Sequence, residues 1–391
     1  MMYNNYMCNF ILGGNILEHY LDNSATTKVS EKAAEKAFEI MTKTYGNPSS
    51  LHKMGMNAES ELRLARKSVA SRLGASDEEV FFTSGGTEAN NLALFGASYA
   101  NARRGKKLVV SASEHSSVIE AAKRLEAEGF EVCYISPRSD GKIHPEDVEA
   151  EVDSSTSLVS VMLVNNETGA INPVADIFEA AKGKNPSVIC HTDAVQAFGK
   201  IEIKARRLKA DLISVSAHKV HAPKGCGAIY IKKGVRLVSR QYGGEQEKKI
   251  RPGTEAMPSI AAFGAACGEF DINENYKKVS ELNAYARERL GKIEGVVFNS
   301  PDDALPYVIN ISVGRVRSEI MLHFLEERGV YVSSGSACAK GKPSYVLSAM
   351  GIAKERADSA LRISFSKYST AEDIDALCDS IAQGLGVLAH R

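Results

Sequence analysis

Three polar segments, each at the end of an apolar run, hold side chains that could do chemistry together. Ser216-Ala-His-Lys219 ends such a run with a hydroxyl, an imidazole and an amine, although a lysine taken alone is more often a solvated side chain. Asp193 also ends an apolar run, and ligands in open α/β sheets lie beyond the carboxyl ends of strands. Asp193 could equally be the N-cap of the next helix. Thr83-Ser-Gly-Gly-Thr-Glu88 offers amides and a hydroxyl to a phosphate at a helix start, or is only a tight turn.

Together these segments match the chemical needs of pyridoxal phosphate (PLP). Its aldehyde needs a lysine, for which Lys219 is the candidate, and its pyridine nitrogen needs an acidic partner such as Asp193 to stay protonated as an electron sink. Its phosphate needs the amides and hydroxyls of the glycine segment. Glu114-His115-Ser116 adds a planar imidazole able to lie on the pyridine face. The joint pattern predicts a PLP enzyme of amino-acid chemistry.

The bulk composition argues against several other classes of ligand. Lys and Arg number 48, Asp and Glu also 48, and there is no run of like charge, so direct nucleic-acid binding is not expected and a small substrate is. Apolar stretches such as 158–164 are far shorter than the roughly 18 residues of a membrane span. The first basic residue is Lys28, which fits no N-terminal targeting signal. We therefore expect a cytoplasmic protein without a membrane anchor.

The cysteines are scattered along the chain. There are seven, at positions 8, 133, 190, 226, 267, 338 and 378, and no C-x-x-C pair. An odd and dispersed set fits neither a disulfide framework nor a zinc site, so no metal is expected. Most of these residues are expected to be buried thiols.

The elements that must position the polar segments alternate between strand and helix patterns. Short unbroken apolar runs are typical of strands covered on both faces, and they recur at 80–83, 108–111, 132–135, 158–164, 188–191, 212–215 and 228–231. Their alternation with helices predicts an α/β fold with a mainly parallel, seven-stranded sheet. Upstream, apolar residues at helical spacing end at Gly74, which predicts an amphipathic helix from Ala58 to Leu73.

A chain of 391 residues exceeds the size of one usual core, so two units are expected. After Pro258 a long helical stretch to about Leu290 is expected to bridge to a smaller α+β unit. That unit is predicted to have strands at 308–313, 330–333 and 361–364, a helix at 318–328, and a last helix capped by Ser369 with Glu372. We expect an N-terminal segment, 1–26, that packs with the small domain, a large PLP-binding domain at 27–262 and a small domain at 263–391.

A series of motifs runs in order along almost the whole chain. They are Tyr20-Leu-Asp-Asn-Ser-Ala-Thr-Thr27, Tyr45-Gly-Asn-Pro-Ser-Ser-Leu-His52, Ser84-Gly-Gly-Thr-Glu88, Val164-Asn-Asn-Glu167, His191-Thr-Asp-Ala-Val-Gln196, Ser216-Ala-His-Lys219, Arg251-Pro-Gly-Thr254 and Ser333-Ser-Gly-Ser-Ala-Cys338. In these motifs the chain resembles the cysteine desulfurases of the NifS/IscS type, in the class V aminotransferase group. The resemblance implies the fold-type I architecture of PLP-dependent transferases, with a smaller α+β domain.

The resemblance also implies a role for each matched position. The cofactor positions are Lys219 for the Schiff base, Asp193 for the pyridine nitrogen, Gln196 for the ring hydroxyl, His115 for stacking on the ring, and, for the phosphate, Gly86, Thr87, Ser216, His218 and Thr254 of the partner subunit in a homodimer. Asn166 and Arg362 match positions that bind the substrate carboxylate. A guanidinium is suited to this role because it clamps a carboxylate with two parallel hydrogen bonds.

Cys338 decides the reaction that the resemblance implies. Its thiolate would attack the sulfur of L-cysteine, alanine would leave, and a persulfide would remain on the enzyme. A free cysteine is most often a small buried residue, but the flanking Ser334, Gly335 and Ser336 argue against a core position. The amine of Lys219 would remove the Cα proton, and His115 would move protons during the reaction.

Other functions keep the same cofactor or the same fold. A selenocysteine lyase is one alternative, and another class V PLP aminotransferase or lyase is a second, which the segment ending at Cys338 argues against. From a different class, a catalytically silent sulfur-carrier partner would keep the fold without the absorbance of a bound cofactor. For the desulfurase, the sulfur acceptor would be an iron–sulfur scaffold protein or a tRNA-thiolation enzyme.

Overall fold

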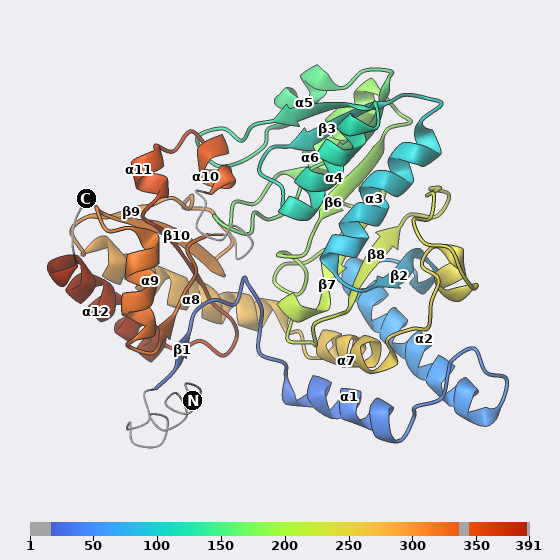
Figure 1. The fold of residues 1–391 in the computed structure, drawn as a ribbon, viewed down its shortest axis with the longest axis horizontal. Coiled ribbons are helices and arrows are strands. Elements are labelled where there is room, and N and C mark those ends of the chain that lie inside the picture. Colours follow the sequence, from blue (N-terminus) through green and yellow to red (C-terminus); the bar gives the residue numbers. More distant parts are fainter. Residues whose placement is uncertain (1–16, 336–343, 389–391) are drawn as a thin grey trace, which may run out of the picture.

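A seven-stranded sheet forms the largest layer of the structure, and two smaller sheets lie beside it (Figure 1). The computed structural model of the protein describes residues 17–335 and 344–388. The strands of the large sheet are β2 (Val80–Thr83), β3 (Lys107–Ser111), β4 (Glu131–Ile135), β5 (Thr156–Ser160), β6 (Ile189–Asp193), β7 (Leu212–Ser216) and β8 (Gly227–Ile231). Their order is β2-β8-β7-β6-β5-β3-β4. β8 is antiparallel to both neighbours and the other pairs are parallel, which confirms the predicted mainly parallel α/β sheet.

Helices cover both faces of this sheet, which explains the unbroken apolar runs of its strands. The helices up to residue 268 are α1 (Glu31–Thr42), α2 (Lys53–Leu73), α3 (Gly86–Asn101), α4 (Ser116–Ala127), α5 (Pro145–Glu151), α6 (Val174–Lys184) and α7 (Met257–Gly268). Leu108 and Val110 of β3 belong to one hydrophobic cluster with α3 and α4, and Val109 belongs to another with α2, α6 and α7. Side chains of a strand alternate between faces, so each face needs its own cover.

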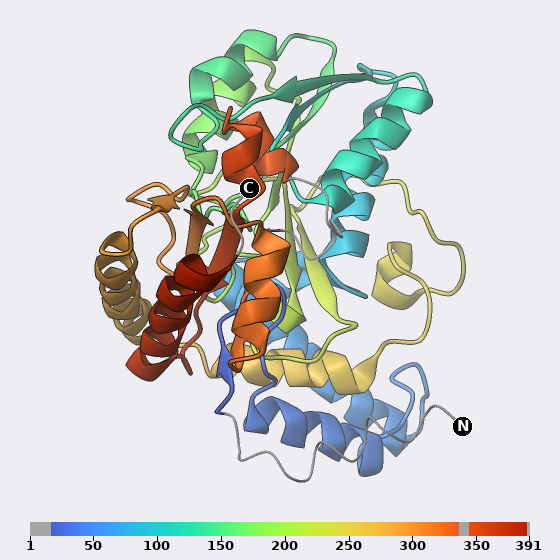
Figure 2. The same cartoon turned by 60° about the vertical axis from the view of Figure 1, so that its left-hand side comes forward.

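The predicted amphipathic helix is confirmed as α2. Its stripe from Ala58 to Leu73 is buried, and Gly74 ends it in the left-handed conformation, with φ 60°. The backbone N–H of Gly74 donates to the carbonyls of Ala70 and Ser71. Both α1 and α2 pack against α7, and Figure 2 shows α1 (blue) and α7 (gold) side by side below the large sheet. The three helices form one packed layer.

The strand predicted at 158–164 is shorter than its apolar run. β5 ends at Ser160, yet the backbone N–H groups of Val161 and Leu163 still donate to carbonyls of β6 residues. Val164 instead forms an antiparallel bridge with Ile171. The apolar run therefore continues into a buried loop, because that loop packs against the carboxyl end of β6.

A three-stranded antiparallel sheet and a two-stranded parallel one make up the rest of the strands. The first has the order β12-β10-β9, from β9 (Val296–Phe298), β10 (Val308–Val313) and β12 (Ala360–Ser364). The second pairs β1 (His19–Tyr20) with β11 (Val330–Tyr331). The remaining helices are α8 (Ile272–Gly291), α9 (Ser318–Glu326), α10 (Tyr345–Ala349), α11 (Lys354–Ala357) and α12 (Ala371–Val387). The predicted strand at 308–313 is confirmed as β10.

Two helix predictions are wrong in detail. The helical stretch after Pro258 is broken between α7 and α8, where the side chain of Asp271 accepts the backbone N–H of Glu274 at 3.0 Å and starts a new helix. The last helix is capped by Thr370 in a reciprocal pair with Asp373, not by Ser369 with Glu372. Ser369 Oγ instead accepts the backbone N–H of Ser366 at 3.0 Å, so it belongs to the preceding turn.

Within the described ranges, none of the helices combines the length and the hydropathy that crossing a bilayer requires.

Candidate active site

A cavity of about 260 Å³, here called the main cavity, opens where β6 and β7 end. The residues around it come from loops and helix starts at this edge of the large sheet and from β12. They are Ser24, Ala25, Gly86, Thr87, Asn90, His115, Ser117, Met162, Asn166, Asp193, Val195, Gln196, Ser216, His218, Lys219 and Arg362. The structure therefore brings together all the predicted cofactor and substrate residues except Thr254.

Lys219 lies in a 3₁₀ turn, Ala217–Lys219, that directly follows β7. Its Nζ donates to the backbone carbonyls of Ser24 at 2.6 Å and of Ala25 at 2.7 Å. These carbonyls belong to the segment that follows β1, far away in the sequence. The amine is thus held at the wall of the main cavity between two distant parts of the chain.

Asp193, the last residue of β6, is held by hydrogen bonds to both carboxylate oxygens. Oδ2 accepts from Nδ2 of Asn90 at 2.7 Å, and Oδ1 accepts from the backbone N–H of Val195 at 2.9 Å. Asp193 lies in the wall of the main cavity. Asn90 did not come out of the sequence reasoning. The spacing of four residues from Gly86 could have indicated it, since Asn90 lies one helical turn later on the same face of α3.

His115 is the N-cap of α4, and its imidazole faces the main cavity. Nδ1 accepts the backbone N–H of Ser117 at 3.2 Å, which leaves the ring proton on Nε2. Burial lowers the pKa of His115 and the charge of Lys219 adds to this, while the carboxylate of Asp193 acts in the opposite direction. A neutral imidazole can accept a proton and, once protonated, can pass it on.

Glu114, next to His115, is completely buried and was not singled out by the sequence reasoning. One carboxyl oxygen accepts the backbone N–H of Met162, and Oε2 has no hydrogen-bond partner among the described residues. Burial, and then the charge of Asp193, raise the pKa of Glu114 well above its usual range. Both causes favour the protonated form of Glu114 over its carboxylate.

The start of α3 has the features of a phosphate site. Gly85 is the N-cap and offers no side chain, so the first amides of the helix are open to an anion. A Cβ on Gly86 would lie 2.9 Å from Cγ2 of Val195, so only glycine lets the backbone border the cavity here. Ser216 and His218 line the same cavity. Burial, and then the charge of Lys219, lower the pKa of His218 to about 4, which leaves a neutral hydrogen-bonding ring.

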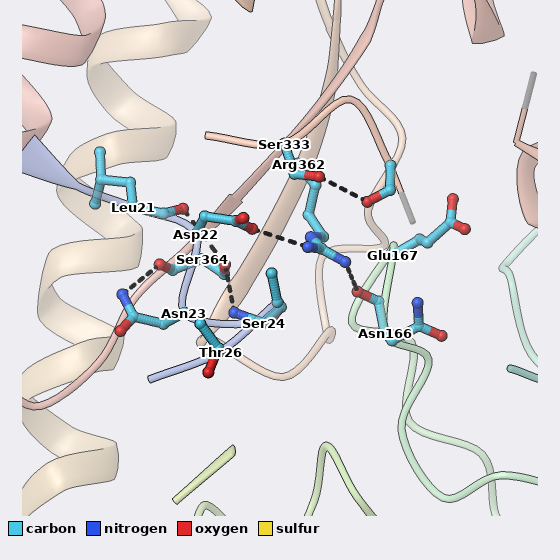
Figure 3. Close-up of polar contacts among 12 residues, drawn as sticks. Leu21, Asp22, Asn23, Ser24, Thr26, Asn166, Glu167, Ser333, Arg362 and Ser364 are labelled. Carbon is cyan, nitrogen blue, oxygen red and sulfur yellow. Dashed lines mark hydrogen bonds and ion pairs between the residues drawn. The ribbon is translucent and has the colours of Figure 1, made fainter. Parts of the chain in front are cut away.

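Arg362 of β12 is buried in the opposite wall, and Figure 3 shows its guanidinium between Asp22 and Asn166. Nη2 donates to Oδ1 of Asp22 at 2.9 Å, and Nη1 donates to the backbone carbonyl of Asn166 at 3.1 Å. Among the described residues, Nε of Arg362 and Oδ1 of Asn166 have no hydrogen-bond partner. A buried guanidinium with a spare donor is suited to bind a carboxylate. Asp22 was not identified from the sequence.

The main cavity does not contain Thr254 of this chain. Thr254, in the loop before α7, is exposed and does not line the main cavity of its own chain. Cys338 lies outside the described residues. The cysteines within them are free thiols away from the main cavity, and burial raises the pKa of Cys133 and of Cys378 to about 11. In the ranges that the structure describes, no group of His, Cys, Asp and Glu residues could hold a metal ion.

The burial of His191 in β6 leads to a prediction of how the free energy of unfolding depends on pH. It is buried between Oγ of Ser160 at 2.8 Å and Oγ of Ser214 at 3.1 Å, and burial lowers its pKa from 6.5 to about 3. The unfolded chain binds this proton first, so the stabilisation is present above pH 6.5 and is lost as the pH falls from 6.5 toward 3. Between pH 6.5 and pH 5 the loss from this residue is about 2 kcal/mol in the free energy of unfolding. Urea unfolding at several pH values measures it.

The matched variant for this measurement is His191→Gln, which keeps a hydrogen-bonding side chain that does not titrate. We expect the decline of the unfolding free energy toward pH 5 to be shallower in the variant by the same amount. Equal slopes in the two proteins would contradict the assignment of a low pKa to His191.

Comparisons with known proteins give a consistent result. The family model of the aminotransferase class-V proteins matches residues 19–377. A protein of Methanosarcina thermophila named cysteine desulfurase IscS is 38% identical over 369 residues, which are 93% of this chain and 91% of that protein. A solved structure of a NifS-like protein has a TM-score of 0.91 and 36% identity, and the match covers 95% of this chain and 100% of that chain. A structure described as SspA in complex with cysteine has a TM-score of 0.81 and 31% identity over 90% of this chain and 100% of that chain.

Proposed function

This chain belongs to the aminotransferase class-V family, among the cysteine desulfurases of the NifS/IscS type, and from this membership we propose that it is a PLP-dependent enzyme that converts L-cysteine to L-alanine. The fold is that of the fold-type I PLP enzymes. The observation that carries the proposal is the joint presence of Lys219, Asp193 and Arg362 in one cavity. These are the amine, the acid and the carboxylate receptor that the reaction requires.

The donor set of the main cavity fits the cofactor. Lys219 would hold it covalently, Asp193 would bind its pyridine nitrogen, and the start of α3 with Ser216 and His218 would hold its phosphate. When bound, PLP supplies an electron sink for the negative charge that develops on Cα of the substrate. A Cβ on Gly86 would lie only 2.9 Å from Cγ2 of Val195, so the start of α3 requires a glycine at this position.

We propose the following roles for residues of the chain in the reaction. Arg362 binds the substrate carboxylate, and the amine of Lys219 removes the Cα proton. The thiolate of Cys338 attacks the substrate sulfur, so that an S–S bond forms while the C–S bond breaks. The proton that the Cys338 thiol loses goes to the substrate Cβ, with the imidazole of His115 as its carrier, and the protonated amine of Lys219 returns its proton to Cα. The products are L-alanine and a persulfide on Cys338.

The direct test incubates the purified protein with L-cysteine and a reductant and measures sulfide and alanine. We expect the two products in equal amounts. L-Selenocysteine is compared in parallel, because a preference for it would indicate a selenocysteine lyase. Alanine without sulfide or persulfide, or no product from a protein that contains the cofactor, would contradict the proposed function.

Asp22 offers a prediction on substrate binding. Its carboxylate holds Nη2 of Arg362 at 2.9 Å but does not line the main cavity, so it orients the guanidinium from behind (Figure 3). Asp22→Asn weakens this contact, and we expect KM for L-cysteine to rise about tenfold, which is about 1.4 kcal/mol, with little change in kcat. Steady-state sulfide production measures both constants.

The control for this prediction is Glu18→Gln, which removes an exposed carboxylate of the same segment. Its KM should equal that of the unmodified protein. A KM for Asp22→Asn that is unchanged or lower would show that Asp22 does not orient Arg362 for the substrate.

We further propose a homodimer in the cytoplasm that passes sulfur to an acceptor protein, an iron–sulfur scaffold or a tRNA-thiolation enzyme. The exposure of Thr254 supports the dimer, because a phosphate ligand on the surface requires a second chain to bring it to the cofactor. Exposed Leu51 and Tyr242, at 98% and 91%, supply apolar area for such an interface. Sedimentation should give a mass for the dimer of twice the 42.2 kDa of one chain.

The free cysteines among the described residues support the proposed location in a reducing compartment.

A further inference from the structure

A second lysine, Lys200, is buried beside the main cavity, and the proposed reaction makes no use of it. Only 6% of its surface is exposed, yet within the described parts of the chain it forms no ion pair. Its Nζ donates to Oε1 of Gln196 at 2.8 Å and lies 5.6 Å from the ring centre of Tyr307. Burying an amine without a counter-ion is costly, so its one directed hydrogen bond calls for an explanation.

The charged groups that act on Lys200 are cationic, although Arg362 is paired with Asp22 and Lys367 with Glu269. Burial, and then the charges of Lys219 and Arg362, lower the pKa of Lys200 to about 7. Lys200 and Lys219 both line a small cavity of about 30 Å³, which has room for one or two waters. The titratable groups that line this small cavity with Lys200 are Lys219, His221, Tyr307 and Lys367. The hydrogen bond to Gln196 is therefore not a by-product of charge pairing.

Gln196 is fixed at both ends of its amide. Nε2 donates to the backbone carbonyl of Ser24 at 3.0 Å, and a carbonyl can only accept. Oε1 accepts from Nζ of Lys200 on the other side. The two contacts demand the same orientation of the amide, which is otherwise free to turn by half a rotation. Because Gln196 lines the main cavity and Nε2 has a second hydrogen, the group that remains available to the cavity is an N–H donor.

We propose that Lys200 is a positioning residue that fixes the amide of Gln196 as a hydrogen-bond donor to the ring hydroxyl of PLP. The inference rests on the proposed function, since it requires that cofactor in the main cavity. A donor at this place stabilises the deprotonated ring oxygen. The stabilised oxygen then attracts the proton on the neighbouring nitrogen of Lys219 less strongly. We therefore expect this donor to lower the midpoint pH at which the absorbance of the bound cofactor changes.

The test is a pH titration of the cofactor absorbance in purified holoenzyme. In Lys200→Met the midpoint should rise by about one pH unit, the size expected for loss of one hydrogen bond to a charged group. Gln196→Ala should give a similar rise, and the double variant should rise no further, because both substitutions remove the same donor. Lys204→Met is the matched control, since Lys204 is a neighbouring lysine that pairs with Glu202 at 3.2 Å, and its midpoint should not move.

The outcomes separate this role from the alternatives. An unchanged midpoint in Lys200→Met with cofactor bound would overturn the inference while leaving the proposed function intact. Rises that add in the double variant would also overturn it, because Lys200 would then act on Lys219 directly through its charge. Should Lys200→Met fail to fold, Lys200→Arg keeps a donor and should retain the original midpoint, and Gln196→Ala must still raise it. A wild-type protein that binds no cofactor would overturn the proposed function and this inference with it.

Discussion

Cys338→Ser is expected to bind the cofactor as the unmodified protein does and to release no sulfide from L-cysteine. A hydroxyl is a much weaker nucleophile toward sulfur than a thiolate, and no S–S bond can form with it. We expect the rate of sulfide and alanine formation to fall by roughly a thousandfold or more. Measuring both products, together with the cofactor absorbance, separates the loss of the nucleophile from the loss of the cofactor.

The other cysteines provide the matched control. Burial raises the pKa of Cys133 to about 11, and the nearby Glu151 adds to the effect, so this thiol is protonated at neutral pH. Cys133→Ser should therefore keep the full rate. If Cys338→Ser retained the rate of the unmodified protein, another nucleophile would have to be sought and the assignment of Cys338 would be wrong.

Lys219→Ala is expected to abolish both covalent attachment of the cofactor and turnover. Without its amine, the protein lacks the group that binds the cofactor aldehyde and the base that removes the Cα proton, so activity should fall by at least about a thousandfold. Borohydride treatment followed by mass measurement should attach the cofactor to the unmodified protein and not to the variant.

Lys224→Ala is the control for this result, because Lys224 is exposed and lies in the same region of the chain. It should still be labelled after borohydride treatment and should still turn over L-cysteine. Covalent labelling of Lys219→Ala at the level of the unmodified protein would place the cofactor on another amine.

The fold could be predicted from the sequence wherever local patterns agree with burial. The large sheet and α2 follow directly from apolar runs and from a helical stripe that ends at Gly74. The prediction failed at boundaries, where tertiary contacts decide. β5 ends at Ser160 although the sequence remains apolar. The residues after Ser160 are apolar because the loop that they form is buried too. The last helix starts after Thr370 because Ser369 is engaged in the preceding turn.

The residues of the candidate site could likewise be predicted only in part. Residues at strand ends, such as Lys219 and Asp193, could be found because parallel strands present their carboxyl ends at one edge. Asp22 and Lys200 could not, because their roles depend on contacts with Arg362 and Gln196 that only the folded chain creates. Glu114 was overlooked for a related reason, since a carboxylate next to a histidine does not reveal that it is buried.

The short segment 22–25 has a consequence for the order in which this protein matures. Its side chain and carbonyls contact Arg362, Gln196 and Lys219, which lie on three separate parts of the chain. During synthesis this segment leaves the ribosome long before Arg362, which lies 340 residues after Asp22. The walls of the main cavity therefore cannot close before Arg362 has been synthesised. Their closure joins residues that lie 340 positions apart in the sequence. We accordingly expect the cofactor to bind productively only after Arg362 has been synthesised.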